Sequence, residues 1–303
     1  MNPLLDFSSL PRFAEIRPEH ISPAIDELLA AAEVALTKAT SAEVPAEYEA
    51  LSAVLDVATE RLSRAWGTVG HLNGVADTPE LRAAYTEKLP KVVEFHTRLG
   101  ADERLFAKYK AVLADPQSRS LTTSRQKALA NALRDFVLSG AELVGDAKVQ
   151  FARVQDRLAE SGQKFSEHVL DATDGYAHYA SEAQLTGVPA DVKASMRAAA
   201  VEAGRDGYKV TLHFPSYLPV MQYAEDRALR ELLYRAYVTR ASEFGPPDLD
   251  NALLMRELLE LRSEEARLLG YQSFAELSLV PKMANSPQQV LDFLNDLARR
   301  ARP

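Results

Sequence analysis

A regular apolar stripe along residues 48–69 constrains the fold of this chain more than any other feature. Its members recur at alternating spacings of three and four residues: Tyr48, Leu51, Leu55, Ala58, Leu62, Ala65 and Val69. This spacing puts them on one face of an α-helix, and such a face must pack against another helix to leave water. The stripe therefore predicts a packed helical protein, and 303 residues are enough to bury a substantial core.

Comparable stripes and cap signals predict helices along most of the chain. The first is expected to begin at Ser22, as an N-cap before Pro23, and to reach about residue 40. Others are expected over about 78–100, 102–114, 124–139, 146–169, 183–203, 226–242 and 253–268. Capping boxes at Ser273 and Ser286, each followed three residues later by Glu or Gln, predict two final helices.

Two short segments break the helical pattern. Residues 207–214 alternate, with Tyr208, Val210, Leu212 and Phe214 on one face, and Pro215 is expected to end the strand. The aromatic segment 175–180 is a candidate partner strand. We therefore expect a mainly α protein, a multi-helix elongated domain with one small two-stranded β ribbon over about 175–180 and 207–214. Its expected subdomains are a helical one over 1–145 and a second over 146–303 that holds the ribbon.

Composition excludes several classes of protein. A net charge of −8 argues against a nucleic-acid partner, because such binding depends on basic side chains that displace phosphate counterions. The absence of cysteine excludes disulfides, thiolate metal ligands and a cysteine nucleophile. The N-terminus does not resemble a signal peptide and no apolar run is long enough for a membrane helix, so we expect a cytoplasmic protein without a membrane partner.

The histidines do not form a recognisable metal site. None of His20, His71, His96, His168, His178 and His213 has another histidine four residues along, so the zinc-binding pattern H-E-x-x-H is absent. The nearest partial arrangements are Glu167 with His168 and His178 with Glu182. A surface or core role is favoured for each, because one histidine and one acid are too few ligands for zinc. From its motifs, the sequence assigns no catalytic, cofactor-binding or metal-ligating residue.

Two further groups leave alternatives open. An aromatic cluster consists of Phe214, Tyr217, Tyr223, Tyr234 and Tyr237. It could line a peptide-binding channel, but packing in the core and at its boundary is the favoured interpretation. The segment 248–251 could be a functional loop, but an interhelix turn with an Asx cap is favoured.

Three stretches resemble a known family. They are YKVTLHFPSYLPVM at 208–221, LRELLYRAYVTRAS at 229–242 and LRSEEARLLGY at 261–271, supported by IRPEH at 16–20 and NALRDF at 131–136. Together they strongly resemble the thimet oligopeptidase family of zinc metallopeptidases, with similarity from Asn2 to Pro303. The resemblance implies a mostly helical protein whose two domains flank a narrow channel for short peptides, and a single zinc ion that serves hydrolysis of internal peptide bonds.

The resemblance also implies a limit on this chain. The family's H-E-x-x-H helix, its later glutamate ligand and its transition-state-stabilising residues are expected beyond residue 303, so this chain looks like the N-terminal half, with the C-terminal zinc-binding catalytic domain absent. We expect zinc in the parent enzyme and none bound by this chain, which is then non-catalytic. If the catalytic domain is a missing partner, an exposed apolar face is expected on the last helices. The alternative is a stand-alone helical scaffold that binds a peptide or protein without catalysis.

Overall fold

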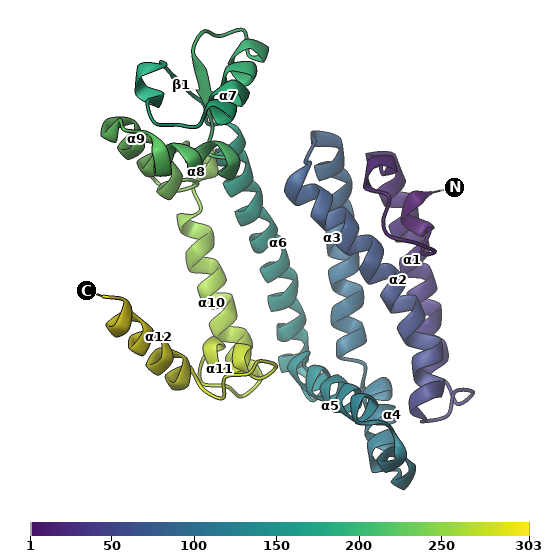
Figure 1. Cartoon of the computed structure of the whole chain (residues 1–303). Helices are drawn as coiled ribbons and strands as arrows, with labels where there is room; N and C mark the ends of the chain where they lie inside the picture. Colours follow the sequence, from purple (N-terminus) through teal and green to yellow (C-terminus); the bar gives the residue numbers. More distant parts are fainter. Residues whose placement is uncertain (1, 303) are drawn as a thin grey trace. The chain divides into compact units, whose positions relative to one another are not determined.

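The computed structural model describes residues 2–302 and is mainly α-helical (Figure 1). Its α-helices are α1 (Pro18–Thr40), α2 (Tyr48–Val75), α3 (Pro79–Gly100), α4 (Glu103–Ala114), α5 (Thr123–Leu138), α6 (Asp146–Asp174), α7 (Ala190–Glu202), α8 (Phe214–Tyr223), α9 (Arg227–Val238), α10 (Ala252–Leu268), α11 (Phe274–Leu279) and α12 (Pro287–Ala301). The strands β1 (His178–Ala180) and β2 (Tyr208–Val210) form an antiparallel pair. The predicted mainly α fold with one two-stranded ribbon is confirmed.

The chain divides into two compact units. Unit 1 holds the residues up to Glu160 and those from Glu260 onward, and unit 2 is Ser161–Leu259. Both α6 and α10 run from one unit into the other. These units are groups of residues in mutual contact. They do not test the division into subdomains at 145/146, which stays a prediction.

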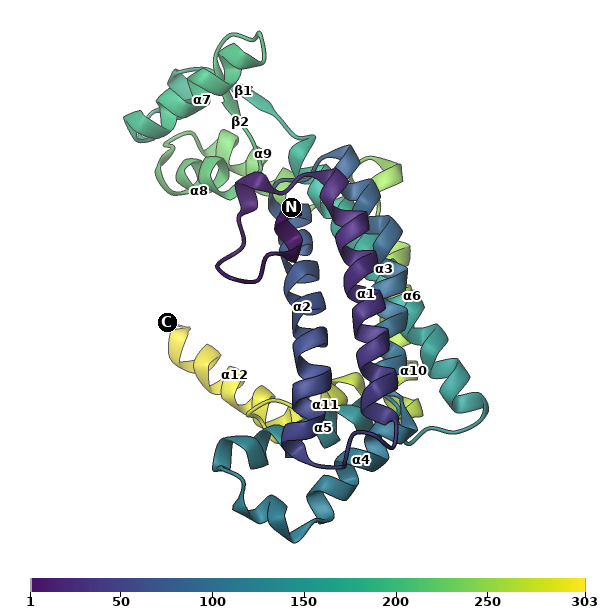
Figure 2. The same ribbon diagram turned by 90° about the vertical axis from the view of Figure 1, so that its right-hand side faces the viewer.

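In unit 1, α1 packs along both α2 and α3, and Figure 2 shows the three helices side by side. The apolar stripe of α2 faces this contact, as its spacing predicts. Leu51, Leu62 and Val69 are at most 1% exposed. Removing these side chains from water supplies the main stabilisation of the bundle, at about 1.5–3 kcal/mol for each large aliphatic residue.

The start of α1 differs from the prediction. The helix begins at Pro18, four residues before the expected N-cap Ser22, and His20 Nδ1 accepts a hydrogen bond of 3.1 Å from the Arg17 backbone N–H. Pro18 occupies the first helical turn, where its missing N–H is harmless. The hydroxyl of Ser22 donates instead to Glu87 Oε2 at 3.2 Å, on the neighbouring helix α3.

A buried lysine joins α1 and α3. The side chain of Lys88 is only 2% exposed, and its Nζ lies 2.7 Å from Asp26 Oδ2 and 2.9 Å from Glu87 Oε1. Hydrogen bonds from Lys88 hold the pKa of Asp26 and the pKa of Glu87 below their usual values. Burial opposes the charge on Lys88, but the bonds to both carboxylates outweigh that effect and raise the pKa of Lys88.

These shifts predict how the stability of the protein depends on pH. Because the pKa values of Asp26 and Glu87 are lower in the folded state, their contribution is complete above about pH 5 and is lost as the pH falls below about 4. Urea unfolding of the wild type and of Lys88→Met between pH 3 and 7 measures this. The wild type should lose more stability on acidification than the variant. Parallel curves would contradict the prediction.

Unit 2 is built on the ribbon. His178 pairs with Val210, Tyr179 with Lys209 and Ala180 with Tyr208. Helix α7 packs against β2, and Val210 shares a buried cluster with Leu229 and Leu233 of α9. Helix α9 therefore covers the ribbon, which needs such packing because two strands alone are only marginally stable.

The predicted strand 207–214 is too long at its end. The strand β2 stops at Val210, and α8 begins at Phe214, whose side chain is 60% exposed rather than on a buried strand face. The hydroxyl of Ser216 accepts a 3.0 Å hydrogen bond from the Thr211 N–H. This side chain replaces a strand partner, so the chain enters α8 at Phe214, with Pro215 in the first helical turn, instead of continuing as a strand to Phe214.

Within the described part of the chain, no helix is both long and apolar enough to cross a membrane. The predicted N-caps are confirmed, because Ser273 accepts a hydrogen bond from the Glu276 N–H and Ser286 from the Gln289 N–H. The return bonds differ from a capping box, since Glu276 and Gln289 accept from the N–H groups of Gln272 and Asn285, one residue before each cap. Helix α12 carries the exposed apolar side chains expected of the last helices, namely Leu291, Phe293, Leu294 and Leu297.

Candidate functional site

His168 has a structural partner. Its Nδ1 lies 2.8 Å from Asn251 Oδ1, and Asn251 Nδ2 donates to the Phe165 carbonyl at 3.0 Å. The Asn251 side chain is fully buried, so these bonds satisfy polar groups that water cannot reach. Glu167 accepts a 3.0 Å hydrogen bond from Gln163 on its own helix. His168 and the Phe165 carbonyl thus join α6 to Asn251, the residue before α10, whereas Glu167 bonds only within α6.

His178 lies in β1, and its Nε2 is buried without a hydrogen-bond partner among the described residues. Glu182 instead lies 4.0 Å from Lys193 Nζ. Across residues 2–302, no three histidine, aspartate, glutamate or cysteine side chains are grouped so that they could hold a metal ion. The side chains of residues 2–302 therefore do not fit a zinc centre.

The aromatic cluster separates into a buried pair and an exposed group. Tyr217 and Tyr237 stack with ring centroids 4.3 Å apart, and the Arg240 guanidinium lies 3.8 Å from the Tyr237 ring centroid. Burial raises the pKa of Tyr217. Core packing, the favoured interpretation, holds for this pair. Phe214, Tyr223 and Tyr234 are more than half exposed and extend to the surface of unit 2.

The segment 248–251 is an interhelix turn. Asp250 Oδ1 accepts a 2.9 Å hydrogen bond from the Ala252 N–H at the start of α10, and the Asn251 N–H donates to the Ala241 carbonyl at 3.0 Å. The Asx cap is confirmed, and the buried Asn251 side chain described above fastens the turn to α6.

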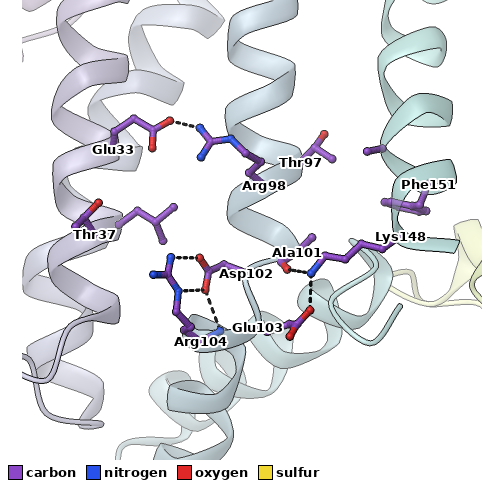
Figure 3. Close-up of a pocket in the computed structure, with 12 residues that line it drawn as sticks. Glu33, Thr37, Thr97, Arg98, Ala101, Asp102, Glu103, Arg104, Lys148 and Phe151 are labelled. Atoms are coloured by element: carbon purple, nitrogen blue, oxygen red, sulfur yellow. Dashed lines mark hydrogen bonds and ion pairs between the residues drawn. The ribbon is translucent and has the colours of Figure 1, made fainter. Parts of the chain in front are cut away.

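A cavity of about 510 Å³ lies in unit 1 beside α1, α3, α4 and α6 (Figure 3). No pattern in the sequence predicts it. Its charged side chains converge from residues distant in the chain: Glu33 from α1, Arg98 from α3, Asp102 to Arg104 at the start of α4, and Lys148 from α6. Phe151 supplies an aromatic part of the wall.

The charges of this cavity are paired with one another. Lys148 Nζ donates to Glu103 Oε1 at 2.7 Å and to the Ala101 carbonyl at 3.0 Å, while Arg98 pairs with Glu33. Figure 3 shows these pairs around the opening. Because each of these charges has a partner, the arrangement holds α1, α3, α4 and α6 together and presents no activated nucleophile or base.

Asp102 has two roles at the start of α4. Its Oδ1 accepts hydrogen bonds from the N–H groups of Arg104 and Leu105 at 2.9 and 3.0 Å, as an N-cap does. Burial would raise the pKa of Asp102, but these bonds and the Arg104 guanidinium outweigh it and lower the pKa. The carboxylate is therefore a cap kept in its charged form.

Comparison with known proteins shows which protein family this chain resembles. Residues 25–148 match the N-terminal domain of neurolysin and thimet oligopeptidase, and residues 220–303 match peptidase family M3. Over the whole chain, identity is 44% to oligopeptidase A of Salmonella typhimurium and 43% to that of Escherichia coli. This chain is similar to peptidase family M3. The resemblance to the thimet oligopeptidase family is thereby confirmed.

The M3 relatives are longer than this chain. The alignments to the two bacterial oligopeptidases cover 100% of this chain and 45% of each relative. A probable cytosolic oligopeptidase A of Arabidopsis thaliana is 38% identical over 93% of this chain and 41% of its own length. The match to the N-terminal domain takes in α2 to α5, and the M3 match takes in α9 to α12.

Proposed function

We propose that this chain is the helical, channel-wall part of an oligopeptidase A-like zinc metalloendopeptidase that hydrolyses short peptides. The observation that carries the proposal is the 43–44% identity to bacterial oligopeptidases A along the full length of this chain. The chain would limit access to the active site, so that short peptides enter and folded proteins do not. The parent enzyme would act in the cytoplasm in peptide turnover.

Catalysis is assigned to a C-terminal zinc-binding domain outside these 303 residues. The support is chemical: a catalytic zinc site needs three protein ligands, and neither the sequence pattern nor the described side chains provide such a set. No residue of this chain is therefore assigned a catalytic role. Alone, the chain should bind no zinc and hydrolyse no peptide.

Helix α12 supports an interface with such a domain. Phe293 is 62% exposed and Leu294 52% exposed, on a helix of which no described residue is buried. Large apolar side chains gathered on one helix usually mark an interaction surface. The same observation fits the second candidate function, a stand-alone helical scaffold that binds a peptide or protein through α12.

An activity assay tests the proposal. The purified 303-residue chain, supplied with zinc, is expected to hold no stoichiometric metal by elemental analysis and to leave a quenched fluorescent oligopeptide uncleaved. Full-length Escherichia coli oligopeptidase A in the same assay is the positive control. One bound zinc per chain together with chelator-sensitive cleavage would contradict the prediction that zinc binding and catalysis belong to a separate C-terminal domain.

The reading frame after Pro303 separates the two candidate functions. A frame that continues and encodes H-E-x-x-H supports the peptidase part, because the zinc-binding motif does not occur in residues 1–303. A stop codon at that point supports the scaffold.

A further inference from the structure

A second cavity in unit 1, of about 610 Å³, has a different character from the one in Figure 3. One part of its wall is aromatic: Trp66 of α2 and Phe151 of α6 both line it. The Trp66 ring stacks on Tyr85 with centroids 4.5 Å apart and planes inclined by 10°, which fixes the indole against α3. Its volume lies in the range of pockets that hold small molecules, roughly 300–1,000 Å³.

The polar part of the wall carries an acid that is not fully partnered. Glu265 of α10 is half-buried, and its Oε1 accepts a 2.9 Å hydrogen bond from Gln155 Nε2. No described side chain donates a hydrogen bond to the other oxygen, Oε2. Burial raises the pKa of Glu265, although the Gln155 hydrogen bond and the Arg262 charge act against this.

The other titratable side chains at this cavity do not place a positive charge against Glu265. His96 of α3 lines it, and burial lowers the pKa of His96, which favours the neutral imidazole. Arg262 faces Glu265 but also places its guanidinium 5.2 Å from the Phe274 ring centroid. The cavity thus joins an apolar aromatic wall to a negative end.

The geometry points to a binding site for a small hydrophobic amine, with the apolar body against Trp66 and Phe151 and the ammonium donating to Glu265. An ammonium would donate a charge-assisted hydrogen bond to Oε2 and would offset the partial burial of the carboxylate. A carboxylate ligand would be repelled by Glu265, and a neutral alcohol would gain only the apolar contacts and an uncharged hydrogen bond. This inference is independent of the proposed peptidase function, because it concerns only residues of this chain.

Trp66 is the only tryptophan of the chain and lines the cavity, so its fluorescence reports on occupancy directly. Phenethylamine, 2-phenylethanol and phenylacetate serve as probes at neutral pH, because they share a ring and differ in their polar end. We expect a saturable change in Trp66 emission with phenethylamine, at a Kd about 10-fold or more below that of 2-phenylethanol. Phenylacetate should bind most weakly. Equal binding of amine and alcohol, or no saturable response to the amine, would overturn the inference.

Two neighbouring glutamates provide a matched pair of variants. Glu265→Gln keeps an acceptor for Gln155 but removes the charge, and it should abolish the preference for the amine. Glu264→Gln is the control, because Glu264 accepts a 2.7 Å bond from Gln150 in the same manner but does not line the cavity. The control should keep the preference. A Glu265→Gln protein that folds, by circular dichroism, and still prefers the amine would overturn the assignment of Glu265. If that variant does not fold, the affinities of the three probes for the wild type still show whether the cavity prefers an amine.

Discussion

Gly187→Ala is expected to lower the free energy of unfolding of unit 2 by about 3–5 kcal/mol. Gly187 has a φ of +90°, in the left-handed region that an alanine side chain disfavours by about 1–2 kcal/mol. A Cβ at this position would also lie 2.2 Å from the Tyr223 carbonyl oxygen, far inside van der Waals contact. That oxygen is part of the backbone at the end of α8, so the clash cannot be relieved by a side-chain rotation.

The close approach at Gly187 is part of how unit 2 is joined. The Glu225 N–H donates a 2.9 Å hydrogen bond to the Thr186 carbonyl, which holds the segment before α7 against the end of α8. Separating the two segments to admit a methyl group would stretch this bond. The strain should therefore reach the buried cluster that contains Leu185 and Val220.

Gly204→Ala is the matched control. Gly204 also has a positive φ, of +64°, but a Cβ there would meet no heavy atom within 4 Å. This variant should lose only the conformational part, about 1 kcal/mol. Urea unfolding followed by circular dichroism measures both. Equal losses for the two glycines would show that the contact with Tyr223 does not matter.

The helices and the ribbon could be predicted because each leaves a local pattern in the sequence. The stripe of α2 reports a buried face directly, and the three buried stripe residues Leu51, Leu62 and Val69 confirm it. The end of β2 could not be read in the same way. Pro215 is a strand terminator and also a residue of first helical turns, and only the bond from Thr211 to Ser216 decides between the two.

The candidate sites could not be predicted, because their partners come from distant parts of the chain. Lys148 and Glu103 are 45 residues apart, and Gln155 and Glu265 are 110 apart. Periodicity shows which face of a helix is buried, but it does not identify the helix that packs against it.

Lys88 is an exception, because its position in the sequence does indicate burial. It lies seven residues after Leu81, three after Tyr85 and four before Val92, and this spacing places it on the apolar stripe of α3. A lysine on such a stripe is either misplaced or paired, since lysine is rarely buried alone. The structure shows pairing, with carboxylates of α1 and of α3 itself.

The second large effect is therefore expected at Lys88. Lys88→Ala should lower the free energy of unfolding by about 2–4 kcal/mol, because it leaves a cavity where a side chain only 2% exposed had packed. Lys88→Met should stay within about 1.5 kcal/mol of the wild type, since methionine fills most of the same space without a buried charge.

Lys91→Ala is the control for the charge itself. Lys91 Nζ lies 3.5 Å from Asp26 Oδ1, so it shares a partner with Lys88, but its side chain is 54% exposed. Loss of that exposed pair should change stability by about 0.5 kcal/mol or less.

Urea unfolding at pH 7 compares the three variants. If packing dominates, Lys88→Ala is far less stable than both Lys88→Met and Lys91→Ala. If Lys88→Met is as unstable as Lys88→Ala, the ion pairs hold α1 to α3, and the packing argument is wrong.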